Sequence, residues 1–280
     1  MTPYHVYEKI HGRLLGNKPV RRHFNFEIHV TDACNLNCAG CFHFAPLADG
    51  DSVYPLAEFE KDVTRLAELF HGKFGWVHVM GGEPLLNHRI NEYLDIVGRN
   101  VKKGQVDLLT NGLLLPQVDD SFFAACRRNK IRIAVTKYPI KADYDKIAEL
   151  VKSKGCDYVE FADRNKPGSF SSPALVPDSK MSGKKNYLKC ILANACVTLD
   201  RGKLFYCSIP TFVRMYNDKF GHAFDYENDC ISIYGNDKKT ILDFLRTPHD
   251  FCKYCDLKYR GRNPVKWAIS KKDKGEWLKL

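Results

Sequence analysis

Residues 24 to 161 alternate short apolar segments with longer segments of helical periodicity. Strands are predicted where residues alternate or form short apolar runs, at 24–30, 75–80, 105–110, 131–136 and 157–161. Between them, apolar residues recur at helical spacing and predict helices over 56–69, 90–97, 117–128 and 144–152. This order is typical of parallel βα units. The expected fold class is therefore α/β, as an open sheet or a complete or partial barrel.

The alternation stops after residue 162, which suggests a division into three parts. Residues 163–187 are rich in Pro, Ser, Gly and Lys and predict an irregular connection or lid. We assign 1–162 to the βα core, 163–189 to this connection and 190–280 to a smaller second module. In that module we expect a hairpin turning at Arg201 and Gly202 and a short helix over 241–245. Residues 271–280 are expected to be solvated.

Charge and hydropathy restrict the partners and the location. No run of about 18 apolar residues predicts a membrane span, and the first residues lack the apolar core of a secretory signal, so a cytoplasmic location is expected. Lys and Arg outnumber Asp and Glu by 43 to 33, which favours anionic partners. No nucleic-acid-binding motif is recognisable, so nucleic acid is not an expected partner. The lysines beside the connection either meet phosphate or carboxylate groups or are solvated: Lys180, Lys184, Lys185, Lys189.

Eleven cysteines are many for a reducing compartment, and an odd number cannot all pair within one chain. The first role to consider for the cysteines is therefore binding of a metal ion or a metal cluster. Three isolated cysteines are expected to be small apolar residues or surface thiols: Cys126, Cys156, Cys230. The other eight form three groups: Cys34, Cys38, Cys41; Cys190, Cys196, Cys207; Cys252, Cys255.

The first group lies in the loop after the first predicted strand. Thiolates at this spacing can converge on one soft metal centre, and three ligands leave one iron of a four-iron cluster open for catalysis. The alternatives are a zinc site completed by a residue such as His43, and three incidental thiols. Spacing alone does not choose between the cluster and these alternatives.

The segment CNLNCAGC at 34–41 resembles the CxxxCxxC loop of the radical S-adenosylmethionine (SAM) enzymes. The resemblance extends to MGGEP at 80–84 and LTNG at 109–112, which follow the second and third strands. It implies a partial (β/α)6 barrel with a [4Fe-4S] cluster on Cys34, Cys38 and Cys41, and SAM as the second cofactor. It also implies a reductive cleavage of SAM to a 5'-deoxyadenosyl radical that abstracts hydrogen from a substrate.

The same resemblance implies roles for residues that follow the strands. Gly81 and Gly82 would let the backbone approach the methionyl part of SAM, and Glu83 would lie near its ammonium group. Two further residues would contact the ribose or the carboxylate: Asn111, Thr136. Many members have an aromatic residue before the third cysteine, where this chain has Gly40, so Phe42 is the candidate for the adenine contact.

The later cysteines resemble the auxiliary-cluster module of SPASM and twitch radical SAM enzymes. Cys190, Gly202 and Cys207 have the spacing of its hairpin, and a CxxC pair follows downstream. Because no cysteine follows Cys255, the shorter twitch form with one cluster fits better. The chosen ligands are Cys190, Cys207, Cys252 and Cys255, with Cys196 as the alternate. A structural zinc site with four cysteine ligands is the other interpretation.

The resemblance leaves several functions open. The auxiliary cluster can accept the electron of the substrate radical, which makes the net reaction an oxidation, or it can tune or relay electrons. The expected substrate is small and carbohydrate-like or anionic, because the residues before 24 are too few for a leader-peptide recognition domain. The alternatives are a peptide maturase that epimerises or crosslinks residues and, outside enzymes, a zinc-stabilised binding module. The resemblance also implies a flavodoxin- or ferredoxin-type electron donor.

Overall fold

The computed structural model describes residues 12, 14–19, 24–49, 52–161, 169–221, 224–263 and 265–279. The five predicted strands of the βα region are present, and each pairs parallel with the next along the chain. They are β1 Phe26–His29, β2 Lys73–Met80, β3 Lys103–Thr110, β4 Ile131–Val135 and β5 Tyr158–Glu160. The predicted α/β class is therefore confirmed.

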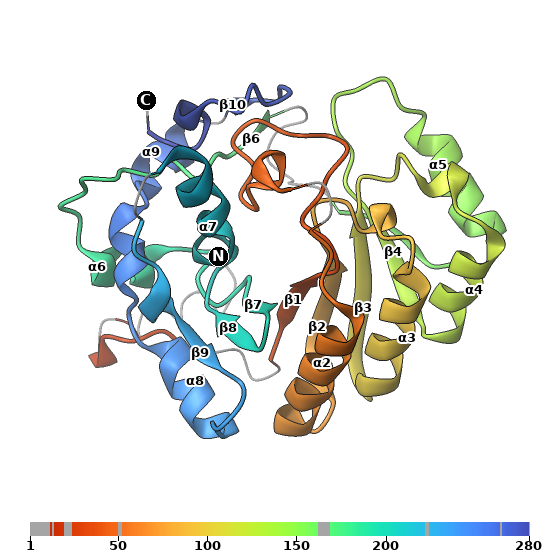
Figure 1. Ribbon diagram of the computed structural model, residues 1–280, viewed down its shortest axis with the longest axis horizontal. Helices are drawn as coiled ribbons and strands as arrows, with labels where there is room; N and C mark the ends of the chain where they lie inside the picture. The colour runs from red at the N-terminus through yellow and green to blue at the C-terminus, as the bar shows by residue number, and fades with distance from the viewer. Residues whose placement is uncertain are drawn as a thin grey trace.

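The four predicted helices between these strands are also present, and each carries an apolar face toward the sheet. They lie side by side along the outer side of the sheet, at the right of Figure 1. Leu66 of the first helix and Leu94 of the second are fully buried in the common core. The helices are α2 Leu56–Phe70, α3 Ile90–Asn100, α4 Asp120–Arg128 and α5 Tyr144–Ser153.

The later strands extend the same sheet. The strand order is β5-β4-β3-β2-β1-β7-β8-β9, so the sheet is open, with edges at β5 and β9. The added strands are β7 Thr198–Asp200, β8 Lys203–Phe205 and β9 Cys230–Ser232, and β7 runs parallel to β1. Arg201 and Gly202 both have positive φ, 44° and 71°, as a tight hairpin turn requires. The predicted hairpin is thus confirmed.

The remaining elements lie on the other side of β1, at the left of Figure 1. The connection after residue 162 is not irregular throughout, because the side chain of Ser182 accepts a hydrogen bond from the Lys185 amide and begins a helix there. A two-stranded antiparallel sheet joins β6 Ser169–Phe170 to β10 Val265–Lys266. The helices are α6 Gly183–Lys189, α7 Ser208–Phe220, α8 Lys238–Arg246 and α9 Leu257–Arg262. In the described ranges, none of the helices has the length and apolar character that a membrane crossing needs.

Candidate active site

A cavity of about 900 Å³ opens at the carboxyl ends of the first four strands. Parallel strands bring their carboxyl ends to one edge, so residues far apart in sequence meet there. Of the residues proposed for the first cluster and for SAM, all but one line this cavity: Cys34, Cys38, Cys41, Phe42, Gly81, Gly82, Asn111, Thr136. Glu83 does not line it.

The three cysteines of the first loop are largely buried thiols that lie close to one another. Burial, with a smaller contribution from the neighbouring Cys41, raises the pKa of Cys34 to about 12 and the pKa of Cys38 to about 11. Three thiolates therefore need a compensating positive centre, which a set of iron atoms supplies. The donor set fits an iron–sulfur cluster on this chemical ground. Among the described residues, no group of three or more His, Cys, Asp or Glu side chains is arranged to hold a single metal ion.

Gly81 and Gly82 are required by the close approach of the first loop. A Cβ atom added to Gly81 would lie 2.2 Å from the carbonyl oxygen of Thr31, and one added to Gly82 would lie 2.3 Å from that of Ala33. The Gly82 amide donates to the Thr31 carbonyl at 2.9 Å. The two glycines thus hold the loop after β2 directly against the start of the cysteine loop, in addition to lining the cavity.

Glu83 is fully buried and joins the ends of β2 and β3. Its carboxylate accepts hydrogen bonds from the Thr110 hydroxyl at 2.7 Å, the Asn111 amide at 2.8 Å and the Leu85 amide at 3.1 Å. Burial raises its pKa to about 7, against these hydrogen bonds, which lower it. In this structure the carboxylate therefore fixes the strand ends beside the cavity.

Asn111 and Thr136 follow β3 and β4 at the cavity wall. The amide of the Asn111 side chain donates to the Asn35 side chain at 2.7 Å, which ties the third strand to the cysteine loop. Phe42 is half-buried and packs against both the core and the Arg260 guanidinium, whose carbon lies 5.7 Å from the ring centre. Sequence reasoning missed Tyr138, which also lines the cavity and lies just after β4.

The last residues cover the cysteine loop, and we call residues 265–279 the C-terminal strap. The predicted solvated tail at 271–280 is wrong at Trp277, which is 0% exposed. Its indole nitrogen donates to the carbonyl oxygen of Cys41 at 2.9 Å, and its ring stacks on Phe44 with 5.8 Å between centres. Gly40 has φ of +67°, and a Cβ atom there would lie 2.8 Å from the Glu276 carbonyl oxygen. The strap thus occupies the space beside Gly40.

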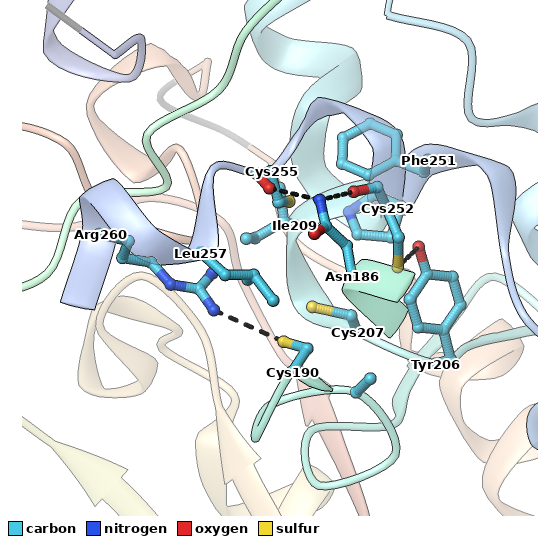
Figure 2. A pocket seen from close by; sticks show the side chains of 12 residues that line it. Asn186, Cys190, Tyr206, Cys207, Ile209, Phe251, Cys252, Cys255, Leu257 and Arg260 are labelled. Atoms are coloured by element: carbon cyan, nitrogen blue, oxygen red, sulfur yellow. Dashed lines mark hydrogen bonds between the residues drawn. The ribbon is translucent and has the colours of Figure 1, made fainter. Parts of the chain in front are cut away.

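The four proposed auxiliary ligands, called the second cysteine group from here on, surround a smaller cavity, whose lining side chains Figure 2 shows. All four chosen ligands line it: Cys190, Cys207, Cys252, Cys255. Cys196 lines neither cavity. The Asn186 side chain donates to the carbonyl oxygens of Cys252 and Cys255 at 2.9 and 2.8 Å and fixes the CxxC turn.

The thiols of this group also need a positive neighbour in order to ionise to thiolates. Burial raises the pKa of Cys255 to about 12, and the Arg260 guanidinium lowers it. Arg260 donates to the sulfur of Cys190 at 3.5 Å. Of the three isolated cysteines, Cys126 is fully buried and Cys156 is 7% exposed, in keeping with small apolar residues.

The two cavities share part of their lining, namely Cys190, Leu257 and Arg260. The large cavity therefore extends from the first cysteine group to the second. Among the described residues that line it, the cationic side chains are Lys189, Arg260 and Arg262, and none is Asp or Glu. Of the lysines considered from the sequence, Lys189 alone lines it. The two arginines follow the CxxC pair closely, which is the signal that could have identified them.

A second set of polar groups lies where α7 covers β1 and β7, and one of them, His43, also lines the large cavity. Glu27 is 4% exposed, accepts a hydrogen bond from the Thr198 hydroxyl at 3.1 Å, and lies 4.0 Å from the Nε2 atom of His43. Burial lowers the pKa of His43 to about 3, so its imidazole is neutral. Burial raises the pKa of Glu27 from its ordinary value of 4.5 to about 7.

This raised pKa predicts a pH-dependent cost that Glu27→Gln removes. Between pH 4.5 and about 7 the folded chain binds a proton at Glu27 that the unfolded chain has lost, so stability falls as pH rises across that window. At about 1.4 kcal/mol per pKa unit, we expect Glu27→Gln to be more stable than the wild type by about 3 kcal/mol near pH 8. Below about pH 4 the two proteins should unfold at the same urea concentration. If the urea midpoints of the wild type and of Glu27→Gln changed in parallel with pH, this account would be contradicted.

Comparison with known proteins gives sequence relatives for part of the chain. No family model matches it. It is 36% identical over 100 residues to GTP 3',8-cyclase of Heliobacterium modesticaldum, which covers 35% of this chain and 30% of that protein. It is 29% identical over 148 residues to molybdenum cofactor biosynthesis protein moc-5 of Caenorhabditis elegans, covering 50% and 22%. The chain thus spans less than a third of the length of these curated relatives.

Solved structures resemble the fold over most of the chain. Native anSMEcpe with bound AdoMet has a TM-score of 0.51 at 12% identity, covering 91% of this chain and 88% of that one. BtrN in complex with AdoMet and 2-DOIA has a TM-score of 0.50 at 15% identity, covering 88% and 100%. At these identities the likeness concerns the fold.

Proposed function

Since the chain belongs to the radical SAM superfamily, we propose that it abstracts a hydrogen atom from a small anionic substrate and oxidises it with the help of an auxiliary cluster. One observation carries the proposal. A single cavity reaches from Cys34, Cys38 and Cys41 to Cys190, and the charged residues in the described part of its lining are all basic. A substrate in this cavity would lie between the two cysteine groups.

The residues divide into two cofactor sites and a substrate space. Cys34, Cys38 and Cys41 would hold the first [4Fe-4S] cluster and leave one iron open for SAM. The backbone at Gly81 and Gly82 and the side chains that follow β3 and β4 would contact SAM, with Phe42 near the adenine. When bound, the cluster and SAM supply a 5'-deoxyadenosyl radical, which is the group that abstracts hydrogen. The protein's task is to orient one C–H bond and exclude water.

The second cysteine group would hold an auxiliary [4Fe-4S] cluster, as a twitch-like module does. Its proposed ligands are Cys190, Cys207, Cys252 and Cys255, all of which line the smaller cavity. Because that cavity shares Cys190 with the large one, an electron leaving the substrate would have a short path to the auxiliary cluster. A flavodoxin- or ferredoxin-type donor, in the cytoplasm, would supply the electron for the first cluster.

The charge of the cavity favours an anionic substrate. Phosphate or carboxylate oxygens can accept hydrogen bonds from Lys189, Arg260 and Arg262. In the described part of the lining, no Asp or Glu side chain would repel such an anion. The curated relatives include GTP 3',8-cyclase, whose name contains a nucleoside triphosphate. A neutral sugar or an uncharged peptide segment would leave the positive charges without partners.

Isotope transfer tests the reaction and the substrate class together. Sugars, sugar phosphates, nucleotides and short peptides carrying deuterium at carbon would be offered to the reconstituted enzyme with SAM and dithionite. We expect deuterium in 5'-deoxyadenosine with a phosphorylated or carboxylated small molecule, and a product two electrons more oxidised. Transfer from a peptide alone would establish the maturase alternative, and zinc without sulfide in the purified protein would establish the binding module.

A charge variant tests the substrate space separately. Changing Lys189 and Arg262 to Gln removes two cations from the cavity but no proposed cluster ligand. We expect KM for the anionic substrate to rise at least about tenfold, because each charge-assisted hydrogen bond contributes about 1.5–3 kcal/mol. The matched control is Lys185→Gln, an exposed lysine of the same helix that does not line the cavity. Equal KM values for both variants would contradict the assigned substrate space.

A further inference from the structure

The C-terminal strap reaches the first cysteine loop with one side chain that contacts a proposed ligand directly. The indole nitrogen of Trp267 lies 3.1 Å from the sulfur of Cys38, although 229 positions separate the two residues. Backbone hydrogen bonds join the strap to the residues on both sides of Cys38. The Ala39 amide donates to the Ala268 carbonyl at 2.9 Å, and the Ser270 amide donates to the Asn37 carbonyl at 2.7 Å.

The position of the indole ring is fixed as well as its backbone. Trp267 is half-buried, and its ring meets the ring of Tyr138 edge-on, with 6.4 Å between centres. Cys38 itself is 8% exposed. The indole N–H therefore points at a shielded sulfur, where a hydrogen bond is stronger than in water.

In this contact the indole nitrogen is the hydrogen-bond donor and the sulfur is the acceptor. The indole nitrogen can only donate a hydrogen bond, and a thiolate sulfur can only accept one. A donor aimed at a cluster sulfur stabilises the more negative, reduced state relative to the oxidised state. A phenyl ring at the same place would keep an aromatic ring beside Tyr138 and lose the donor.

We propose that Trp267 is a positioning residue that raises the reduction potential of the cluster held by Cys34, Cys38 and Cys41. This inference rests on the first cluster of the proposed function and on the contact between the strap and Cys38. By raising this potential, the strap would make the first cluster easier for the cell's electron donor to reduce. It is independent of the identity of the substrate and of the auxiliary cluster.

The test is a redox titration of the reconstituted full chain and of W267F with dithionite and mediators, followed by electron paramagnetic resonance. The first cluster's signal is the one that changes when SAM is added. We expect the equilibrium constant for its reduction to be about tenfold smaller in W267F, which is about 59 mV for a one-electron couple. The matched control is W76F, since Trp76 lies on β2, stacks on His78 and lines neither cavity. W76F should titrate like the wild type.

The outcomes separate this inference from the proposed function. If W267F titrates like W76F, the inference is overturned and the proposed function stands. If the wild type carries no iron–sulfur cluster, both are overturned. If W267F loses its iron, its reduction potential cannot be titrated, and a second measurement on the wild-type sequence then tests the inference. In wild-type protein whose tryptophan carries nitrogen-15 in the indole ring, the reduced first cluster should show hyperfine coupling to that nitrogen. Absence of the coupling would overturn the inference.

Discussion

Changing Cys34, Cys38 and Cys41 to Ala should lower the iron content from about eight to about four atoms per chain and abolish the cleavage of SAM. The physical reason is that these three largely buried thiols are the protein's sulfur donors at the strand ends where Gly81, Asn111 and Thr136 meet. Without them, the open iron that would bind SAM has no support. Iron, acid-labile sulfide and zinc per chain after anaerobic reconstitution, together with 5'-deoxyadenosine formation, give the answer.

The chain provides a control with the same number of replaced cysteines. Cys126, Cys156 and Cys230 line neither cavity, and changing all three to Ala should leave about eight iron atoms and normal SAM cleavage. Should the wild type hold about four iron atoms that fall to none in the first variant, the radical chemistry would stand without the auxiliary cluster. Zinc without sulfide would contradict the whole account.

The sequence predicted the βα region well because local signals determine it. Apolar runs and helical spacing specify each strand and helix of residues 24–161, and parallel pairing then brings the strand ends together. The alternation in 24–30 was nevertheless misleading in one respect. Glu27 and His29 are 4% and 3% exposed, because β7 and α7 cover the side of β1 that an amphipathic strand would leave in water.

The second half was harder to predict because its elements pair with distant segments. Leu199 of β7 lies beside Ile28 of β1, and nothing local in either strand specifies that partner. Helix α7 begins directly after Cys207 without a loop, and Pro210 in its first turn obscures the helical pattern although proline is tolerated there.

The residues that sequence reasoning missed around the site share this property. Trp267 contacts Cys38 only through the fold of the strap, and Trp277 is buried although charged residues precede it. For Glu83 the motif implies a place near the ammonium group of SAM, and the fold adds three hydrogen bonds that tie β2 to β3. Motifs identified the loops that meet at the cavity, and packing determined which side chains face it.

Replacing the four cysteines of the second group should separate SAM cleavage from substrate oxidation. In a variant with Cys190, Cys207, Cys252 and Cys255 changed to Ala, we expect about four iron atoms to remain and SAM to be cleaved still, because the first loop is unchanged. Oxidised product should fall below detection, since the substrate radical would have no acceptor beside the cavity. Iron analysis and the ratio of product to 5'-deoxyadenosine measure the two effects.

Cys196→Ala is the matched control for this variant and decides between the two candidate ligands before the hairpin. Cys196 lines neither cavity, whereas Cys190 lines both and accepts a hydrogen bond from Arg260. The Cys196→Ala protein should therefore keep about eight iron atoms and form product at the wild-type ratio. Loss of about four iron atoms in Cys196→Ala would show that Cys196 replaces a chosen ligand. Product formation by the fourfold variant would instead exclude the auxiliary cluster as the electron acceptor, because oxidation would then proceed without it.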